Sequence, residues 1–392
     1  IGDREVRINR SLTAACGAAV LHFAAQLAIM RGRICRGGGV AVYDLERFHI
    51  LLVEDNGYIR NVLEDLLRQF RVGRVATAAN GQEAIEYLQM VAKQGAAARR
   101  DLDLVISDMI MTPINGLMLL RWLRSSKDSP NRFLPFVMLS GAADSEYVIS
   151  ARDSGVTEFM AKPFSGRSIY RFLLEVIDFP HQIVATNAYF GPDRRRRDGP
   201  TGTDELRVKA ESDITIVRSA HEIETPEDSS DVWYFRMPNH LQKKAGGTSG
   251  GGAGEIPVAL LEQAEEKLER VGLDFTDWAT DYLGNLSKLC AAAMQNPQSR
   301  STQFEDINLV AHELRGQGGT FGYPLITTFA KSLYDATRPG TTFDDAAVEI
   351  VKAHVDAMRA VIREKVAGDG GETGRALLKS LEIAIAKHSA AA

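Results

Sequence analysis

Short apolar runs alternate with amphipathic stretches in the first half of the chain, between residues 48 and 178. Continuous apolar runs are typical of strands in a parallel sheet, because helices cover both faces of such a sheet. They predict strands at 48–53, 74–79, 102–109, 133–140 and 156–161. Helical apolar spacing follows each strand, at 56–70, 81–92, 116–124, 144–154 and 165–178. Five such units predict an α/β doubly wound, five-stranded parallel sheet with right-handed crossovers.

Residues 255–390 show a different pattern, in which helical spacing recurs without intervening strands. The predicted helices lie at 257–270, 275–294, 304–317, 323–337 and 343–366, with a short one at 377–387. The sequence Gly318-Gly319-Thr320 interrupts the pattern, and Pro324 suits the first turn of the next helix. We therefore expect an all-α helical bundle at 255–366, followed by a C-terminal tail helix within 367–392.

Residues 179–254 have little periodicity and much charge, which predicts a linker between these two domains. Four consecutive arginines at 194–197 have aspartates on both sides and lack basic helices nearby. This setting favours a solvated or partner-docking loop over an arm that binds nucleic acid. Residues 232–235 are too aromatic for free solvent and are expected to pack on a neighbouring domain. The glycines of 246–254 predict a flexible tether.

Residues 1–47 form an N-terminal extension, and the chain begins at Ile1. Residues 11–30 are mostly apolar and have arginines on both sides, which is compatible with a membrane anchor or a signal segment. The presence of His22 and Gln26 argues against a membrane segment, and arginines at both ends give no orientation. The favoured interpretation is an untranslated leader with the true start near Val40. N-terminal sequencing of the native protein distinguishes the two.

Composition narrows the class of protein. With 392 residues, the chain has room for two or three domains, and its 45% hydrophobic and 25% charged residues are ordinary for a soluble globular protein. A formal net charge of −5 argues against general affinity for nucleic acid. The three cysteines lie far apart, so neither a disulfide framework nor a zinc cluster is indicated, and a reducing cytoplasm fits.

Polar residues of the types that bind or accept phosphoryl groups lie at the ends of four predicted strands. They are Glu54, Asp55, Asp108, Ser140 and Lys162. Because ligands of such sheets bind beyond the carboxyl ends of the strands, we expect these side chains to meet at one edge. Three carboxylates in one place need a cation, and Mg²⁺ prefers oxygen ligands and accompanies phosphate substrates. One carboxylate would then be the nucleophile in a phosphoryl transfer, while the lysine and the serine contact phosphoryl oxygens.

The motifs around these residues resemble those of the response-regulator receiver family, which has a flavodoxin-like fold. The resemblance covers 48–178 and rests on four motifs: Leu52-Val53-Glu54-Asp55-Asn56, Ile106-Ser107-Asp108-Met109, Met138-Leu139-Ser140-Gly141 and Met160-Ala161-Lys162-Pro163-Phe164. It implies that Asp108 is the phosphoacceptor and that Glu54, Asp55, Asp108 and the backbone carbonyl of Ile110 hold Mg²⁺.

The same resemblance assigns the remaining site residues. It implies that Ser140 is the switch hydroxyl, that Lys162 binds the phosphoryl group and that Phe159 is the switch aromatic. It also implies a cis bond before Pro163. One departure is Met111-Thr112-Pro113, in which the proline comes one place later than usual after the aspartate, so the geometry of that loop is open.

A second phosphoryl acceptor is indicated by His312, in the predicted helix 304–317. At about 100° per residue, His312 lies roughly 140° from the centre of the apolar arc, which predicts an exposed side chain. Gly316, one turn later, leaves room for a partner, and Arg315 could steady an anion. A neutral imidazole is available as a nucleophile near pH 7. The alternative is a histidine without a functional role, either on the surface or in the core of the bundle.

The segment 312–322 is similar to the motif of the histidine phosphotransfer (HPt) family, in which a histidine precedes leucine, lysine, glycine and small residues. General bundle similarity extends over 255–366. The resemblance implies that His312 carries a phosphoryl group and that Arg315 contacts it. Arg315 replaces the usual lysine, which keeps the charge but changes the contact geometry.

Together these patterns predict a cytoplasmic two-component phosphorelay protein that uses Mg²⁺, Asp108 and His312. Its expected partners are a sensor histidine kinase and other receiver or phosphotransfer proteins. Nucleic acid is not expected, nor is a membrane unless the N-terminal segment is real. Self-dephosphorylation is compatible with the site, whereas a kinase ATP site is not indicated because a suitable glycine-rich loop is missing. The alternative is a response regulator whose helical domain is a protein-interaction output module, with His312 idle.

Overall fold

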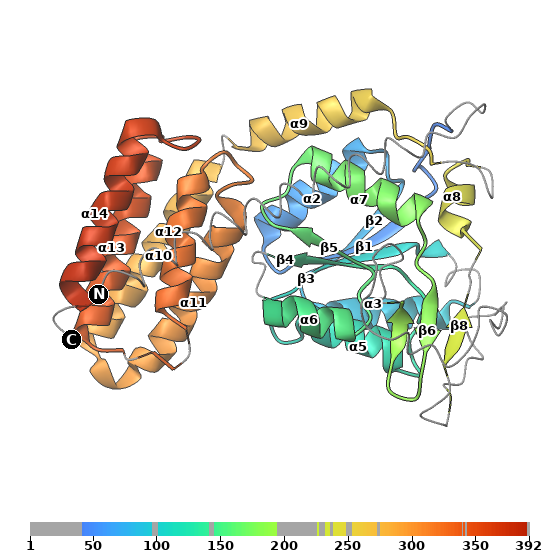
Figure 1. The fold of residues 1–392 in the computed structure, drawn as a ribbon, viewed down its shortest axis with the longest axis horizontal. Helices are drawn as coiled ribbons and strands as arrows, with labels where there is room; N and C mark the ends of the chain where they lie inside the picture. Colours follow the sequence, from blue (N-terminus) through green and yellow to red (C-terminus); the bar gives the residue numbers. More distant parts are fainter. Residues whose placement is uncertain are drawn as a thin grey trace, which may run out of the picture.

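The computed structural model describes residues 41–95, 101–140, 145–193, 226, 232–235, 238–247, 253–272, 275–338, 340–341 and 343–389. A sheet with helices on both faces lies beside a bundle of long helices (Figure 1). The expectations for residues 1–40, for the arginines at 194–197 and for most of the glycine tether fall outside the described residues. Within the described part, helices of the length and apolarity needed to cross a bilayer are absent.

The sheet has five parallel strands in the order β2-β1-β3-β4-β5, which confirms the predicted doubly wound fold. The strands are β1 (His49–Val53), β2 (Arg74–Ala78), β3 (Leu104–Asp108), β4 (Phe136–Ser140) and β5 (Glu158–Ala161). Every residue of β1 and of β3 is buried, as the continuous apolar runs predict. The order places β1 and β3 side by side, so the polar residues that follow them are neighbours.

Helices cover both faces of the sheet (Figure 1). On one face lie α2 (Gly57–Gln69) and α7 (Gly166–Asp178), and on the other lie α3 (Gly81–Lys93), α5 (Gly116–Ser125) and α6 (Ser145–Asp153). The first turns of α2, α3 and α5 are capped by asparagines whose side-chain oxygens accept backbone N–H groups. These caps fix where each helix begins after the carboxyl end of a strand, which is the edge that carries the functional residues.

The expected linker contains more regular structure than its sequence suggests. An antiparallel sheet of β6 (Ile183–Ala185), β7 (Phe190–Pro192) and β8 (Trp233–Phe235) forms in the order β7-β6-β8. Phe235 is 1% exposed and packs edge-on against Phe133. The expectation that the aromatic segment packs on a neighbouring domain is therefore confirmed. A short helix, α8 (His240–Lys244), follows it. Strands this short contain too few residues to show a period. Pairing partners far away in sequence stabilise them instead.

Two segments expected outside the receiver lie on it. Tyr43 and Leu45, from the expected N-terminal extension, are buried in the same core as the β1 side chains. The helix α9 (Val258–Gly272), grouped with the bundle from its spacing, packs on α2 and α7 instead. Its buried residues, Leu260, Ala264 and Leu268, join the receiver core. The spacing of apolar residues identifies a helix with one buried face, but it does not identify the domain that covers this face.

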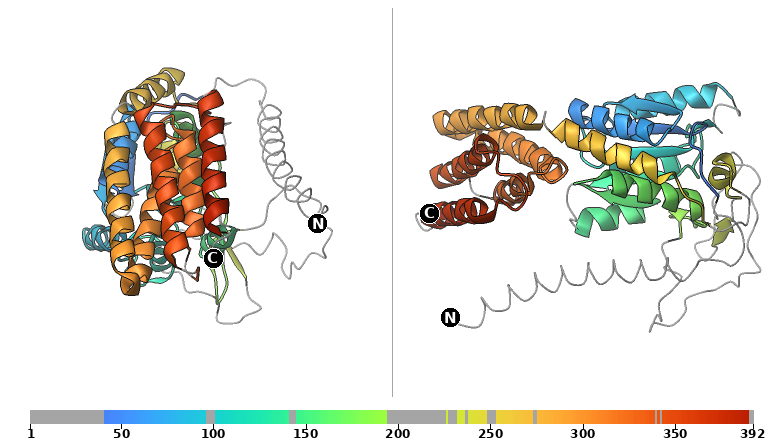
Figure 2. Two further views of the ribbon diagram at one scale, coloured as in Figure 1. Left: turned by 90° about the vertical axis from the view of Figure 1, so that its left-hand side faces the viewer. Right: turned by 90° about the horizontal axis from the view of Figure 1, so that it is seen from above.

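The helical domain is built from α10 (Phe275–Gln295), α11 (Arg300–Gln317), α12 (Pro324–Ala336), α13 (Asp345–Arg363) and α14 (Gly371–Ser389). These helices run alongside one another in both views of Figure 2. The C-terminal helix, expected as a short tail, is longer than predicted and packs along α13. One apolar core, which includes Phe304, Phe329 and Met358, lies between the helices. The prediction of an all-α domain is confirmed.

A buried histidine should make this domain sensitive to acid. His354 is 0% exposed, its Nδ1 lies 2.7 Å from the Ile350 carbonyl oxygen, and its Nε2 lies 2.9 Å from the Ser332 hydroxyl. Burial lowers the pKa of His354, although the bond to Ile350 opposes this. The unfolded chain therefore binds a proton near pH 6.5 that the folded chain binds only at lower pH, so stability falls as pH drops below 6.5.

A His354→Gln variant should lose this component of the pH dependence. Between pH 7.5 and 5.5, the wild-type free energy of unfolding should fall more steeply than that of the variant, by at most about 1.4 kcal/mol per pH unit. Urea titrations of both proteins across this range provide the measurement. Parallel curves for the two proteins would show that His354 does not contribute.

Candidate functional site

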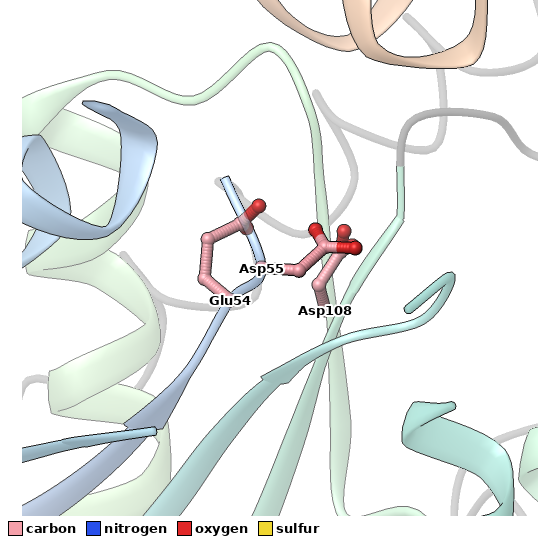
Figure 3. Close-up of side chains that lie close together, drawn as sticks. All are labelled: Glu54, Asp55 and Asp108. Carbon is pink, nitrogen blue, oxygen red and sulfur yellow. The ribbon is translucent and has the colours of Figure 1, made fainter. Parts of the chain in front are cut away.

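Three carboxylates meet at the carboxyl edge of the sheet. Glu54 and Asp55 follow β1, and Asp108 ends the neighbouring β3. One ligand oxygen from each lies within 4.8 Å of the others, and Figure 3 shows the three side chains converging. Glu54 and Asp108 are 0% exposed, while Asp55 is more open to solvent. The predicted convergence of these residues is therefore present in the fold.

A single buried ammonium group stands among these acids. Lys162 follows β5, and its Nζ lies 2.9 Å from Glu54 Oε2 and 3.0 Å from Asp108 Oδ2. Burial alone would lower the pKa of Lys162, but the charges of Asp108 and Glu54 outweigh burial and raise it. Lys162 is therefore a permanent cation at this edge. It is placed to contact an anion bound at Asp108.

The lysine does not satisfy the whole cluster. Burial raises the pKa of Glu54 well above its usual range, with Asp108 adding to this and Lys162 opposing it. Burial and Asp108 also raise the pKa of Asp55. Within the described part of the chain, Glu54 Oε1 is buried without a hydrogen-bond donor. An unsatisfied carboxylate oxygen among three acids fits a hard divalent cation such as Mg²⁺, which takes oxygen ligands.

The remaining predicted receiver residues lie around this cluster. Ser140 ends β4 opposite Ala161 of β5, and its side chain falls outside the described part. Phe159, in the middle of β5, is partly buried against the core under α3 and α5. Ile110 follows Asp108 by two residues, at the start of the loop that leads to α5. The predicted cis bond before Pro163 is present, and the Thr112–Pro113 bond is also cis.

The expected exposure of His312 is wrong. Its side chain is only 6% exposed, because α11 packs against both α10 and α12. The ring centroid of His312 lies 5.8 Å from that of Tyr334 in α12, and its Nδ1 is 3.2 Å from an Arg315 nitrogen. The Arg315 guanidinium in turn lies over the Tyr334 ring at 4.2 Å. Angular distance from one apolar arc does not predict exposure when a helix is covered on more than one side.

Glu313, the residue after His312, reaches the receiver. Asn56, the N-cap of α2, donates from Nδ2 to Glu313 Oε2 at 3.0 Å and to the Tyr282 hydroxyl at 2.8 Å. Burial raises the pKa of Glu313 to about 7, with Lys162 opposing this and Asp108 and Asp55 adding to it. The helical domain therefore inserts a fourth acid beside the cluster.

Sequence reasoning missed this role. The cap position of Asn56 is detectable from the sequence, but nothing local in the sequence places α11 next to the sheet.

A family model for the response regulator receiver domain matches residues 50–173. The chemotaxis protein CheY1 of Helicobacter pylori is 30% identical over 128 residues, which are 33% of this chain and 94% of that protein. The response regulator ARR7 of Arabidopsis thaliana is 32% identical over 137 residues, 34% of this chain and 65% of that protein. A solved structure of Vibrio cholerae CheY4 is 26% identical, covering 33% of this chain and 98% of that one, with a TM-score of 0.28.

A doubly wound sheet with three acids and a lysine at its carboxyl edge defines a receiver-type phosphoacceptor domain. Through residues 50–173, the chain belongs to the response regulator receiver family of two-component signal transduction. The chain spans 65% of the length of the Arabidopsis regulator.

Proposed function

We propose that Asp108 accepts a phosphoryl group from the phosphohistidine of a sensor kinase or phosphotransfer protein. The observation that carries this proposal is the buried Asp108 carboxylate, 3.0 Å from the Lys162 ammonium and beside two further acids. A carboxylate oxygen of Asp108 forms the bond to phosphorus as the bond from phosphorus to the donor nitrogen breaks. Lys162 then balances charge on the phosphoryl oxygens.

Mg²⁺ belongs to the same proposal. Glu54, Asp55, Asp108 and the Ile110 carbonyl would hold the ion, which when bound neutralises charge on the transferred group. Ser140 and Phe159 would act as the switch hydroxyl and the switch aromatic. Attack of water on the acyl phosphate would release phosphate and return Asp108 to a carboxylate. We place this chemistry in the cytoplasm, because kinases of this class are phosphorylated there. The free, buried thiol of Cys290 fits a reducing compartment.

The helical domain serves best as the output module of this receiver. It contacts the receiver at the carboxyl edge itself, through the bond between Asn56 and Glu313. A change in charge at Asp108 therefore acts electrostatically on Glu313 in α11. His312 need not react for this output to work, because its side chain is buried beside Tyr334 and Arg315.

Phosphorelay through His312 is the second candidate function. The observation that favours it is that Glu313, the next residue in the chain, lies at the acid cluster, so this turn of α11 is already at the receiver edge. Transfer would require the His312 ring to leave the contacts that now bury it. Arg315 would then contact the phosphoryl group.

One labelling experiment tests both functions. The full chain is loaded by a phosphorylated histidine kinase with Mg²⁺ present, and wild type is compared with Asp108→Ala and His312→Ala. Base-labile acyl phosphate that disappears in Asp108→Ala is the expected result. An equal amount of base-labile label in that variant would refute the receiver function. Acid-labile, base-stable label that disappears in His312→Ala would support the relay, and its absence from wild type would exclude the relay.

A further inference from the structure

The helical domain lies beside the carboxyl ends of the sheet strands, among them β3 (Figure 1). The last residue of β3 is Asp108. In this arrangement Asp108 is 0% exposed. Glu313 comes from the side of the bundle and is held by Asn56, which follows Glu54 and Asp55 directly in the chain. The charges of Lys162, Asp108 and Asp55 all act on Glu313. The approach to the phosphoacceptor from this side is therefore occupied by another acid of the same chain.

Further contacts hold the two domains together. The Phe164 amide donates to Thr320 Oγ1 at 3.1 Å, two residues after Lys162. Gly319 abuts Pro163 so closely that a Cβ added to the glycine would lie 2.8 Å from Pro163 Cγ. This close approach requires glycine, and it explains Gly319 without a direct role in phosphoryl transfer.

An aromatic contact extends the interface away from the acids. The ring of Tyr58, in the first turn of α2, stacks on Trp278 of α10 at 5.9 Å and lies 5.5 Å from Phe321. Its hydroxyl donates to the Val271 carbonyl at 2.9 Å. Phe321 is 6% exposed in this arrangement. Aromatic burial of this kind stabilises the docked arrangement. Glu313, an acid beside the three acids of the receiver, destabilises it. The interface thus combines attraction with a local electrostatic penalty.

We propose that the helical domain is an intramolecular gate on the receiver, with Glu313 closing Asp108 to a phosphodonor in the docked arrangement and undocking opening it. This inference rests on the proposed function of Asp108. Only the undocked fraction of molecules accepts a phosphoryl group, so the observed rate is reduced in proportion to that fraction.

The gate is reciprocal. A phosphoryl group on Asp108 brings additional negative charge beside Glu313, and like charges at close range disfavour the docked form. At equilibrium, docking destabilises the phosphorylated state by the same coupling free energy by which phosphorylation weakens docking. Undocking uncovers Trp278 and Phe321, which Tyr58 now contacts. The aromatic surface of the helical domain is then available to a partner only after the signal arrives.

Two variants open the site in different ways and leave the acids of the receiver intact. Glu313→Ala removes the side chain that closes the site, and Tyr58→Ala removes the aromatic contact. The matched control is Glu305→Ala, an exposed acid on the same helix. With acetyl phosphate and Mg²⁺ as the phosphodonor system, both variants should be phosphorylated about tenfold faster than wild type, and the control should match wild type. A rate that is unchanged or slower in Glu313→Ala would overturn the gate.

Hydrogen exchange measures docking without any phosphoryl transfer. In the absence of acetyl phosphate, backbone amides of residues 164–168 and 318–323 should exchange faster in Tyr58→Ala than in the control, while β1 and β3 amides should not change. Glu313→Ala, which removes an acid from beside three others, should not exchange faster there than the control. Unchanged exchange at the interface in Tyr58→Ala would overturn the gate. If exchange responds as expected but no protein, including the control, accepts a phosphoryl group, then the proposed function of Asp108 fails and the docking contact stands.

Discussion

Replacement of Lys162 by methionine is expected to lower the free energy of unfolding of the receiver by about 3 kcal/mol in a chelator. The side chains of Glu54 and Asp108 are 0% exposed, and Lys162 is the buried cation between them. Methionine fills similar space but leaves both acids without this partner, which is costlier than removing the whole group of charges. Hydrogen exchange of the β1 and β3 amides reports this loss within the full chain.

Mg²⁺ should restore much of this stability, because a divalent cation can replace the missing charge among the oxygens. The stabilisation by Mg²⁺ should therefore be larger in Lys162→Met than in wild type. The control is Lys267→Met, which removes a lysine paired with Asp65 where both side chains are about half exposed. That variant should stay within about 1 kcal/mol of wild type. A Lys162→Met protein as stable as this control in chelator would contradict the account.

The receiver site was predictable because its geometry follows from the sheet. Apolar runs identify β1 and β3, and the parallel order forces Asp55 and Asp108 to the same edge whatever the loops do. The sequence could not predict how the charges balance there. The raised pKa of Glu54 and the burial of Lys162 depend on how completely the surrounding elements exclude water.

The placement of His312 and Glu313 shows where sequence reasoning fails. The helix α11 was predicted correctly, but its apolar arc does not reveal that Tyr334 and Arg315 cover the opposite side. The residue that reaches the receiver is Glu313, through a hydrogen bond between residues 257 positions apart in sequence. Such contacts depend on how two finished domains meet, and periodicity within one helix carries no information about that.

The same limit explains the segments around the receiver. Residues that look like a linker or an extension supply Tyr43 to a bond with Asp178 and Phe235 to a cluster with Phe133. Each segment is too short to show a period, and each is stabilised by a partner that lies far away in sequence. In contrast, α9 was predicted as a helix, and only its location on α2 and α7 was unexpected.

Arg124 looks like a surface arginine at the end of α5, yet it is only 3% exposed. Its guanidinium donates to the carbonyl oxygens of Gly155 at 2.9 Å and Leu134 at 2.8 Å, which lie just before β5 and β4. It also donates to the Arg132 carbonyl at 2.7 Å. Burial lowers the pKa of Arg124 to about 10, so the side chain still carries its charge at neutral pH.

An Arg124→Met variant is expected to lose about 3 kcal/mol of receiver stability, because three carbonyl groups lose their donor and methionine supplies none. Relief from burying a cation offsets only part of this loss, since the carbonyls remain buried. Arg121→Met is the matched control, because Arg121 lies on the same helix, is exposed and donates to the Ser154 hydroxyl at 3.1 Å rather than to buried carbonyl groups. The control should change stability by about 0.5 kcal/mol or less. Hydrogen exchange of the β4 and β5 amides measures both variants, and equal losses would show that the buried carbonyl bonds do not stabilise this part of the fold.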